Sequence, residues 1–382
     1  MIATALVPRD GGAHAFEEAA TRAAADLGGA AVDLAVVFAG EADLREVEAG
    51  AAAVRERLGP QALVGCAAQG VVGAGREIEE GGVAVWAASL PGGHAETFRL
   101  EASRASPGSV AVTGLPDLDE ADAVILLVDP YTFPVEPLLA RIGVDHPGLP
   151  VLGGLAAGGG PGRGALVRDA EVAPRGAVGV ALRGVDVRCC VSQGARPIGP
   201  EMVITAVEGN VVHELASRPA LQRLTQAIED LDVEERLLAM QGLLLGVVID
   251  ENQPDYERGD FLVRGLLGAD EQTGSITVGE RVRVGQTVRM HVRDGRSADE
   301  DLRRALEAQL RDLREPPAGA LLFTCNGRGS QMFDAPDHDA SAIAKAFSGA
   351  PAAGLFCAGE IGPVGGRNFL HGFTATVAVF PS

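Results

Sequence analysis

The stretch Gly354–Phe373, GLFCAGEIGPVGGRNFLHGF, decides how the rest of the chain is organised. Apolar residues lead into it, and polar side chains stand among glycines in its middle and end. Glycine lets other groups approach the backbone closely, so the pattern predicts a lined pocket rather than a plain turn. The polar residues of this predicted pocket are Cys357, Glu360, Arg367, Asn368 and His371.

Fainter versions of this pattern occur twice earlier in the chain. Ala62–Gly70 (ALVGCAAQG) and Pro150–Gly159 (PVLGGLAAGG) each read as a strand running into a turn of small residues. In all three places an apolar strand and a helix come before, and a further strand follows. We therefore predict three copies of a strand, helix, strand, strand unit. Their first strands lie at Asp33–Phe38, Asp122–Asp129 and Gly319–Cys325.

This repeat predicts the fold class. A strand that returns through a helix to a second strand predicts a parallel pair, and a glycine-linked third strand predicts an antiparallel neighbour. We expect a mixed α/β protein whose mixed sheets are flanked by helices. A leucine stripe from Leu302 to Leu313, at helical spacing, predicts a helix that faces the core.

Length and composition predict two domains. The chain has 382 residues, 47% of them hydrophobic, which is enough for a large core. Pro197, Gly199 and Pro200 punctuate a region between the second and third copies. We predict one domain over residues 1–200 and another over 201–382.

Charge and hydropathy exclude several classes of partner. The net charge of -20, from 52 acidic and 32 basic residues, opposes binding to nucleic acid or anionic lipid. The longest apolar run, Leu237–Ile249, is too short to span a bilayer, and the N-terminus lacks the pattern of a secretory signal. We expect a cytoplasmic protein without membrane insertion. The five cysteines form no CxxC pair and no zinc spacing, so no metal site is predicted.

The candidate binding residues gather where strands end. In open α/β sheets, ligands bind outside the carboxyl ends of strands. Arg328 and Arg367 each lie beside glycines, and a guanidinium in such a place suits a ligand carboxylate or phosphate. The repeat predicts that both arginine loops meet at the same sheet edge. The full set of predicted ligand-binding residues is Cys325, Asn326, Arg328, His338, Cys357, Glu360, Arg367, Asn368, His371, Gln193 and Arg196.

The same segments contain residue types suited to cysteine catalysis and to metal binding. Cys325 or Cys357 with His338 or His371 as base would make a cysteine-dependent hydrolase or transferase. No nucleophile-elbow or cysteine-protease signature is present, so buried thiols are the favoured interpretation and no catalytic residue is assigned.

The Asp337-His338-Asp339 triplet has metal-ligand residue types, but three adjacent residues rarely converge on one ion. We expect Asp337 or Asp339 to cap the following helix, with His338 facing the pocket. The glycine runs match no nucleotide-binding fingerprint.

These segments together resemble the FIST family, which has tandem FIST N and FIST C sensory domains. The matching pieces span nearly the whole chain in the expected order: Ala62–Gly70, Pro150–Gly159, Val191–Pro200, Leu243–Glu251, Gly259–Leu267, Phe323–Gly329, Pro336–Asp339 and Gly354–Phe373. The resemblance implies an intracellular sensory module that binds small ligands, with amino acids or related anionic metabolites as the proposed class.

The resemblance also implies coupling to a signalling output. The chain ends two residues after its last predicted strand, so we expect a stand-alone sensor whose output is a separate partner protein. We expect a ligand contacting both domains to stabilise a closed arrangement. A homo-oligomer is left open. We expect a binding protein rather than an enzyme and no resident cofactor. Some family members are haem-based gas sensors, so His371 or His213 as an iron ligand is the minority alternative.

Overall fold

The computed structural model of the chain describes residues 1–9, 12–106, 109–311 and 313–382. They form two compact units, each discontinuous in sequence. Unit 1 comprises Met1–Val191, Leu302–Leu370 and Ala375–Ser382. Unit 2 comprises Ser192–Asp301 and His371–Thr374. The predicted division at residue 200 follows chain order, whereas the compact units reflect the insertion of unit 2 into the chain of unit 1.

Unit 1 contains the three predicted copies. Copy 1 consists of β2 (Leu34–Gly40), α2 (Leu44–Leu58), β3 (Ala62–Ala68) and β6 (Val83–Ala88). Copy 2 consists of β9 (Ala123–Val128), α3 (Val135–Asp145), β10 (Val151–Leu155) and β13 (Ala177–Arg183). Copy 3 consists of β22 (Gly319–Cys325), α7 (His338–Ala346), β23 (Ala352–Cys357) and β26 (Thr374–Phe380).

Strand pairing within the copies confirms the predicted mixed α/β class. In each copy the first strand pairs in parallel with the second and antiparallel with the last. Helix α2 shows how local sequence fixes an element between two parallel strands. Asp43 and Glu46 form a capping box at its start, and Gly59 adopts a left-handed conformation (φ +56°) at its end.

Each copy also contains a short hairpin that the sequence did not predict. The hairpins are β4–β5 (Val71–Gly73, Arg76–Ile78), β11–β12 (Leu166–Arg168, Glu171–Ala173) and β24–β25 (Glu360–Val364, Arg367–His371). Each pairs with the second strand of another copy: β4 with β23, β11 with β3, and β24 with β10. The exchange runs from copy 1 to 3, from 3 to 2 and from 2 to 1, so a closed cycle with pseudo-threefold character links the copies.

Four further strands complete the sheets of unit 1. Sheet 1 has the order β1 (Ile2–Val7), β6, β2, β3, β11, β12. Sheet 2 has the order β25, β24, β10, β9, β13, β7 (His94–Ser106), β8 (Ser109–Thr113). Sheet 3 has the order β14 (Arg188–Gln193), β26, β22, β23, β4, β5.

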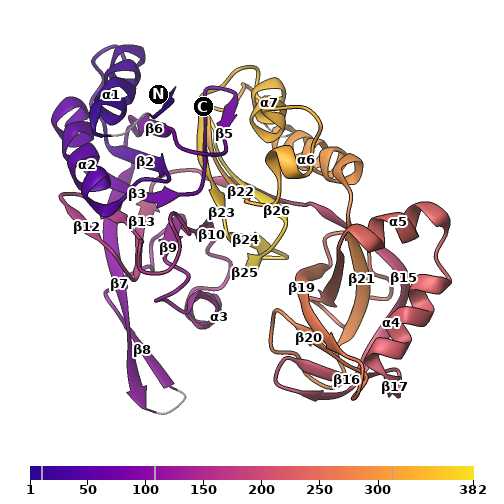
Figure 1. Cartoon of the computed structure of the whole chain (residues 1–382). Helices are drawn as coiled ribbons and strands as arrows, with labels where there is room; N and C mark the ends of the chain where they lie inside the picture. The colour runs from indigo at the N-terminus through magenta and orange to yellow at the C-terminus, as the bar shows by residue number, and fades with distance from the viewer. Residues whose placement is uncertain (10–11, 107–108, 312) are drawn as a thin grey trace. The chain divides into compact units, whose positions relative to one another are not determined.

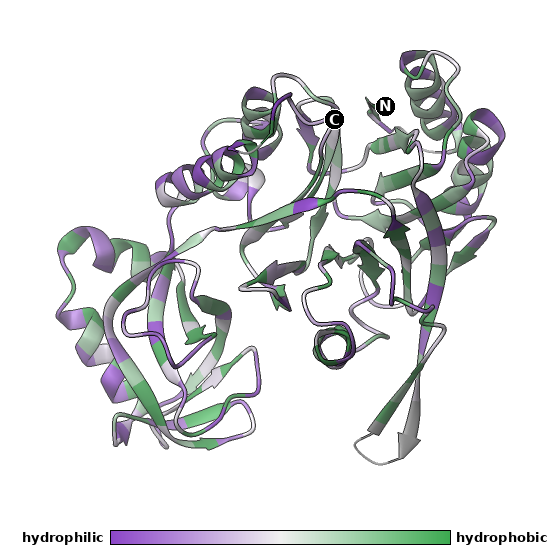
Figure 2. Cartoon of the chain, turned by 180° about the vertical axis from the view of Figure 1, so that it is seen from behind, coloured by the Kyte–Doolittle hydropathy of each residue, from purple (hydrophilic) through white to green (hydrophobic). Residues whose placement is uncertain are grey.

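The three sheets share one buried core. Residues from all three copies form a single hydrophobic cluster, in which Phe38 meets Phe323 edge to face at 6.5 Å and Trp86 meets Phe380 at 5.0 Å. Helices pack against the sheets in three further clusters: α1 (His14–Asp26) and α2 on sheet 1, α3 on sheet 2, and α6 (Gly295–Leu310) with α7 on sheet 3 (Figure 1). The strands are largely hydrophobic, whereas the helices mix hydrophobic and hydrophilic residues (Figure 2). Leu302 and Leu306 of α6 are fully buried, which confirms the core-facing leucine stripe at these positions.

Unit 2 is a closed antiparallel barrel. Its strands follow the order β15 (Ala195–Glu208), β21 (Thr287–Arg293), β18 (Leu243–Val248), β19 (Phe261–Asp270), β20 (Ser275–Val278), β16 (Val211–Leu215). The pairing of β15 with β16 closes the ring, and β17 (Arg218–Pro219) extends it beside β16. Helices α4 (Ala220–Glu229) and α5 (Val233–Gln241) contribute to its core. Within the residues described above, no helix is long and apolar enough to cross a membrane.

Candidate functional site

The loop after β22 forms the centre of the candidate site. The backbone amide of Asn326 donates to the carbonyl of Cys357 at 2.7 Å, and that of Arg328 donates to the carbonyl of Cys325 at 2.8 Å. Cys325 and Cys357 face each other as register partners in the parallel pair β22–β23. The carboxyl ends of these two strands therefore bring Cys325, Asn326, Arg328 and Cys357 together, as the repeat predicted.

Arg328 and Asp339 form a fully buried, bidentate ion pair. Arg328 Nε lies 2.7 Å from Asp339 Oδ2, and Nη2 lies 2.8 Å from Oδ1. The hydroxyl of Thr324 also donates to Oδ2, at 2.7 Å. Burial alone would raise the pKa of Asp339, but the guanidinium holds that pKa well below its usual range. The same pair raises the pKa of Arg328 against the opposite effect of burial. Two donors of the predicted ligand-binding guanidinium are thus engaged inside the protein.

His338 stacks on an aromatic ring next to this pair. Its ring lies 3.4 Å from that of Phe333, nearly parallel, and its Nδ1 is 2.9 Å from Asp339 Oδ1. The Arg328 guanidinium lies 5.1 Å from the same Phe333 ring, within cation–π range. His338 therefore lies in the cluster around Arg328.

The prediction that Asp337 or Asp339 caps α7 was wrong. Asp337 occupies the N-cap position of α7 with φ +58°, but its side chain does not cap the helix. It accepts instead from the backbone amide of Glu77 at 2.6 Å, while Asp339 turns inward to Arg328. Glu77 of β5 supplies the cap, since its Oε1 accepts from the amide of Ala340 at 2.9 Å. The cap comes from the hairpin that copy 1 contributes to sheet 3.

Sequence reasoning also missed Glu79, the second acid from this hairpin. Its two carboxylate oxygens accept from the amide and the hydroxyl of Ser330, each at 2.7 Å, and so hold the loop after β22 in place. Burial and the nearby Asp339 raise the pKa of Glu77 to about 7. No local signal marks these glutamates, because their partners are about 250 residues away along the chain.

The buried thiols of Cys357 and Cys66 are poorly suited to nucleophilic chemistry. Burial raises the pKa of Cys357 well above its usual value, and Glu360, Cys66 and Cys325 add to this effect. Burial likewise raises the pKa of the Cys66 thiol far above neutrality. Glu360 is itself fully buried at the start of β24. A thiolate is the reacting species in cysteine catalysis, and these surroundings disfavour it.

Two buried polar atoms of the loop after β22 have no hydrogen-bond partner among the described residues. They are Nη1 of Arg328, a donor, and Oδ1 of Asn326, an acceptor. Leaving a buried polar atom unpaired typically costs about 1–3 kcal/mol. The loop thus presents one unmatched donor and one unmatched acceptor, two residues apart. In the described parts of the chain, no group of three or more His, Cys, Asp and Glu side chains could hold a metal ion.

Arg367 and Asn368 lie on a different sheet from Arg328, which corrects the prediction of one shared edge. Their strand β25 belongs to the hairpin that crosses to sheet 2. Asn368 anchors this crossing, because its amide donates to Leu149 O at 2.8 Å and accepts from Val151 N at 2.9 Å. Arg367 is exposed, with its guanidinium 5.2 Å from the ring of Phe369.

Gln193, Arg196 and His371 belong to unit 2. The side-chain amide of Gln193 donates to Phe261 O at 2.8 Å. Arg196 pairs with Glu235 at 2.9 Å and with Asp294 at 3.1 Å. His371 is 3% exposed and groups with the barrel. Each of these three side chains is thus placed in unit 2, while the cluster around Arg328 lies in unit 1.

Comparison with known proteins identifies the family of the chain. The FIST N domain model matches residues 33–218, and the FIST C domain model matches residues 220–363. The chain belongs to the FIST family. It is also 46% identical over 369 residues to uncharacterized proteins of Mycobacterium tuberculosis and Mycobacterium bovis. These matches cover 96% of this chain and 96% and 95%, respectively, of the two relatives.

The two FIST matches do not coincide with the two compact units. The FIST N match contains copies 1 and 2 and continues into the first strands of the barrel. The FIST C match contains the remainder of the barrel and copy 3 as far as β24. FIST domains are generally sensory, signal-transduction domains, so the chain is a member of a sensory family.

Proposed function

We propose that this FIST protein is a stand-alone intracellular sensor that binds a small ligand with a carboxylate and an ammonium group, such as an amino acid or a related anionic metabolite. The family supports a sensory role. The single observation that carries the ligand class is the pair of unmatched buried atoms on Arg328 and Asn326. A guanidinium N–H suits a carboxylate, and an amide oxygen suits an ammonium group.

Contacts with neighbouring side chains hold the loop in one arrangement, which a bound ligand would stabilise further. Two donors of Arg328 are fixed by Asp339, so the guanidinium is held in one orientation with Nη1 left over. Gly329 has φ +61°, and a Cβ there would lie 2.7 Å from Glu79 Oε1. Glu79 therefore holds the loop in place by accepting a hydrogen bond from the backbone amide of Ser330. Ligand binding would favour one state of this loop, and the shift in population would be the signal.

Isothermal titration calorimetry with a panel of amino acids and dicarboxylates tests the proposal. Asn326→Leu removes the amide oxygen while keeping a similar volume, and Asn252→Leu makes the same change at an exposed turn of unit 2. We expect saturable heats from an amino acid with the wild type and with Asn252→Leu, and at least tenfold weaker binding with Asn326→Leu. Arg367→Ala should bind like the wild type, since Arg367 lies on sheet 2. Equal heats from the wild type and Asn326→Leu would refute the assignment.

We also propose a cytoplasmic location, a separate output protein as partner and no resident cofactor. A fluorescent fusion that is uniformly distributed in the cell would support the location, and a membrane-restricted fusion would contradict it. Expression with haem supplied, followed by an absorption spectrum, tests the cofactor. A Soret band would contradict the proposal and favour the haem alternative.

A further inference from the structure

Sheet 2 ends in a projecting edge strand. The long strand β7 and its partner β8 extend from unit 1 as a two-stranded arm (Figure 1). The strand order of sheet 2 ends at β8, so one edge of Ser109–Thr113 faces no further strand in the described part of the chain. An open strand edge presents backbone N–H and C=O groups that another chain can pair with.

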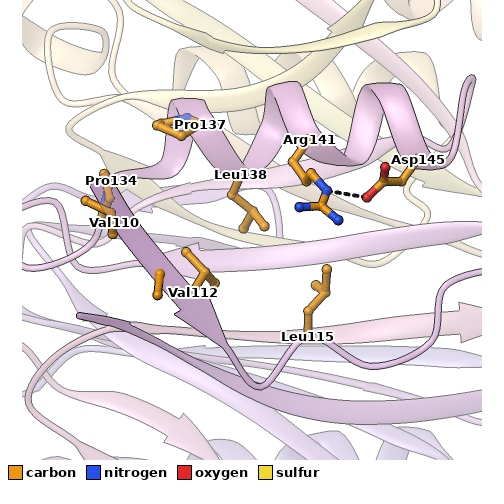
Figure 3. Close-up of a pocket in the computed structure, with 9 residues that line it drawn as sticks. Val110, Val112, Leu115, Pro134, Pro137, Leu138, Arg141 and Asp145 are labelled. Atoms are coloured by element: carbon orange, nitrogen blue, oxygen red, sulfur yellow. Dashed lines mark hydrogen bonds and ion pairs between the residues drawn. The ribbon is translucent and has the colours of Figure 1, made fainter. Parts of the chain in front are cut away.

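An apolar groove of about 450 Å³ lies beside this edge, between β8 and α3 (Figure 3). Its apolar walls are Val110, Val112, Leu115, Pro134, Pro137 and Leu138. Half of the Val110 side chain is exposed. The groove therefore combines an open strand edge with apolar surface that alternate side chains of a strand could cover.

One end of the groove is polar, and an acidic side chain lies beyond it. Arg141 and Asp145 of α3 form an ion pair at 2.5 Å there, drawn as a dashed line in Figure 3. The next residue, His146, lies 3.5 Å from the largely exposed Asp119. Arg141 and Asp145 balance each other's charge within the groove lining, and the exposed Asp119 adds one negative charge beyond it, in a protein whose net charge is -20.

We propose that an extended, basic and apolar peptide segment of another protein binds in this groove as an added strand beside β8. Backbone hydrogen bonds along β8 would supply affinity, and the groove would take the apolar side chains at alternate positions. Lysine or arginine side chains would face Asp119, beyond the polar end of the groove, and the negative field of the protein. This proposal does not depend on the ligand site, because the groove is formed by copy 2 and the arm alone.

The dimensions favour a peptide over a second copy of the chain. A stable homodimer typically buries about 800 Å² on each partner. Here the edge strand has five residues and the groove has a volume of about 450 Å³. Pairing β8 with its own copy would also bring together two chains of net charge -20. A short basic peptide needs no large buried area and is not repelled by the negative charge of the protein.

Fluorescence anisotropy tests the proposal with labelled heptapeptides that carry Val, Ile or Leu at alternate positions and Lys or Arg between them. The same peptides with N-methylated backbone amides keep the side chains but lose the strand-pairing donors. The protein variants are Val110→Lys in the groove and Val144→Lys, which changes a 75% exposed valine of α3 that does not line it. Circular dichroism establishes that both variants fold.

We expect saturable binding of at least one peptide to the wild type and to Val144→Lys, with at least tenfold weaker binding to Val110→Lys and no binding of its N-methylated form. No saturable binding of any peptide up to millimolar concentration would overturn the proposal. Equal binding of the N-methylated form, or of Val110→Lys, would overturn it as well. Light scattering that shows a dimer broken by Val110→Lys would assign the edge to a second copy instead.

Discussion

Replacing Asp339 by Asn tests whether the buried ion pair organises the candidate site. Asp339 is 1% exposed and accepts hydrogen bonds from Nε and Nη2 of Arg328 and from the hydroxyl of Thr324. The Asn variant keeps the size of the side chain but removes the carboxylate that pairs with the buried Arg328 guanidinium. Removing one partner of a buried pair typically costs about 3–5 kcal/mol. Because whole proteins are stable by about 5–15 kcal/mol, the loss would be a large fraction of the total.

Urea unfolding followed by the fluorescence of Trp86 measures this loss. Trp86 is the only tryptophan of the chain and is fully buried in the core of unit 1, so its signal reports the unit that contains the pair. Glu18→Gln is the matched control, since it breaks the exposed Arg22–Glu18 pair and should cost less than about 0.5 kcal/mol. A loss below about 1 kcal/mol for Asp339→Asn would refute the reasoning. Because the folded pKa of Asp339 is lowered, the wild-type contribution is fully present above the unfolded pKa near 4 and fades only as pH falls towards the folded value.

Three further predictions follow from the same contacts. The pKa of Glu77 is raised to about 7, so the wild-type free energy of unfolding should fall as pH rises from about 4.3 to 7. Urea unfolding at several pH values should show a smaller fall for Glu77→Gln. An equal fall in both proteins would contradict the raised pKa. A Cβ at Gly154 would lie 2.2 Å from Cys357 Sγ, so Gly154→Ala should lower the unfolding midpoint and Cys357→Ala should restore part of it; strict additivity of the two changes would argue against this contact. Burial raises the pKa values of Cys66 and Cys357, so both should resist iodoacetamide in the folded protein between pH 6 and 8. Rapid labelling of Cys357 below pH 7 would contradict this and revive the cysteine-dependent enzyme.

Local pattern was enough to predict the three copies but not how they combine. The apolar strands around Phe38, Leu126 and Phe323, each followed by a helix and a second strand, gave the correct parallel pairs. Strands such as β4 and β11 have three residues each and are bordered by glycines or turns, so they read as turns. Their exchange between copies depends on pairings across the chain, such as Val71 with Leu355, that no local window contains.

Local sequence also predicted part of the candidate site but not its tertiary contacts. The position of Arg328 after a strand correctly predicted its neighbourhood with Cys357 and His338. Its pairing with Asp339, and the crossing of Arg367 to sheet 2, follow from tertiary contacts. Glu77 and Glu79 had no local signal, since they act on α7 and on the loop after β22 only once the copy 1 hairpin has joined sheet 3.

Mass spectrometry of small molecules retained by the purified protein tests the proposed sensor most directly. The wild type and Asn326→Leu are each equilibrated with a deproteinised cell extract, separated from unbound metabolites and denatured to release what they hold. The proposal predicts that the wild type releases a metabolite with a carboxylate and an ammonium group, close to one per chain, and that Asn326→Leu releases little of it. Release of no such metabolite by the wild type, or equal release by both proteins, would contradict the account.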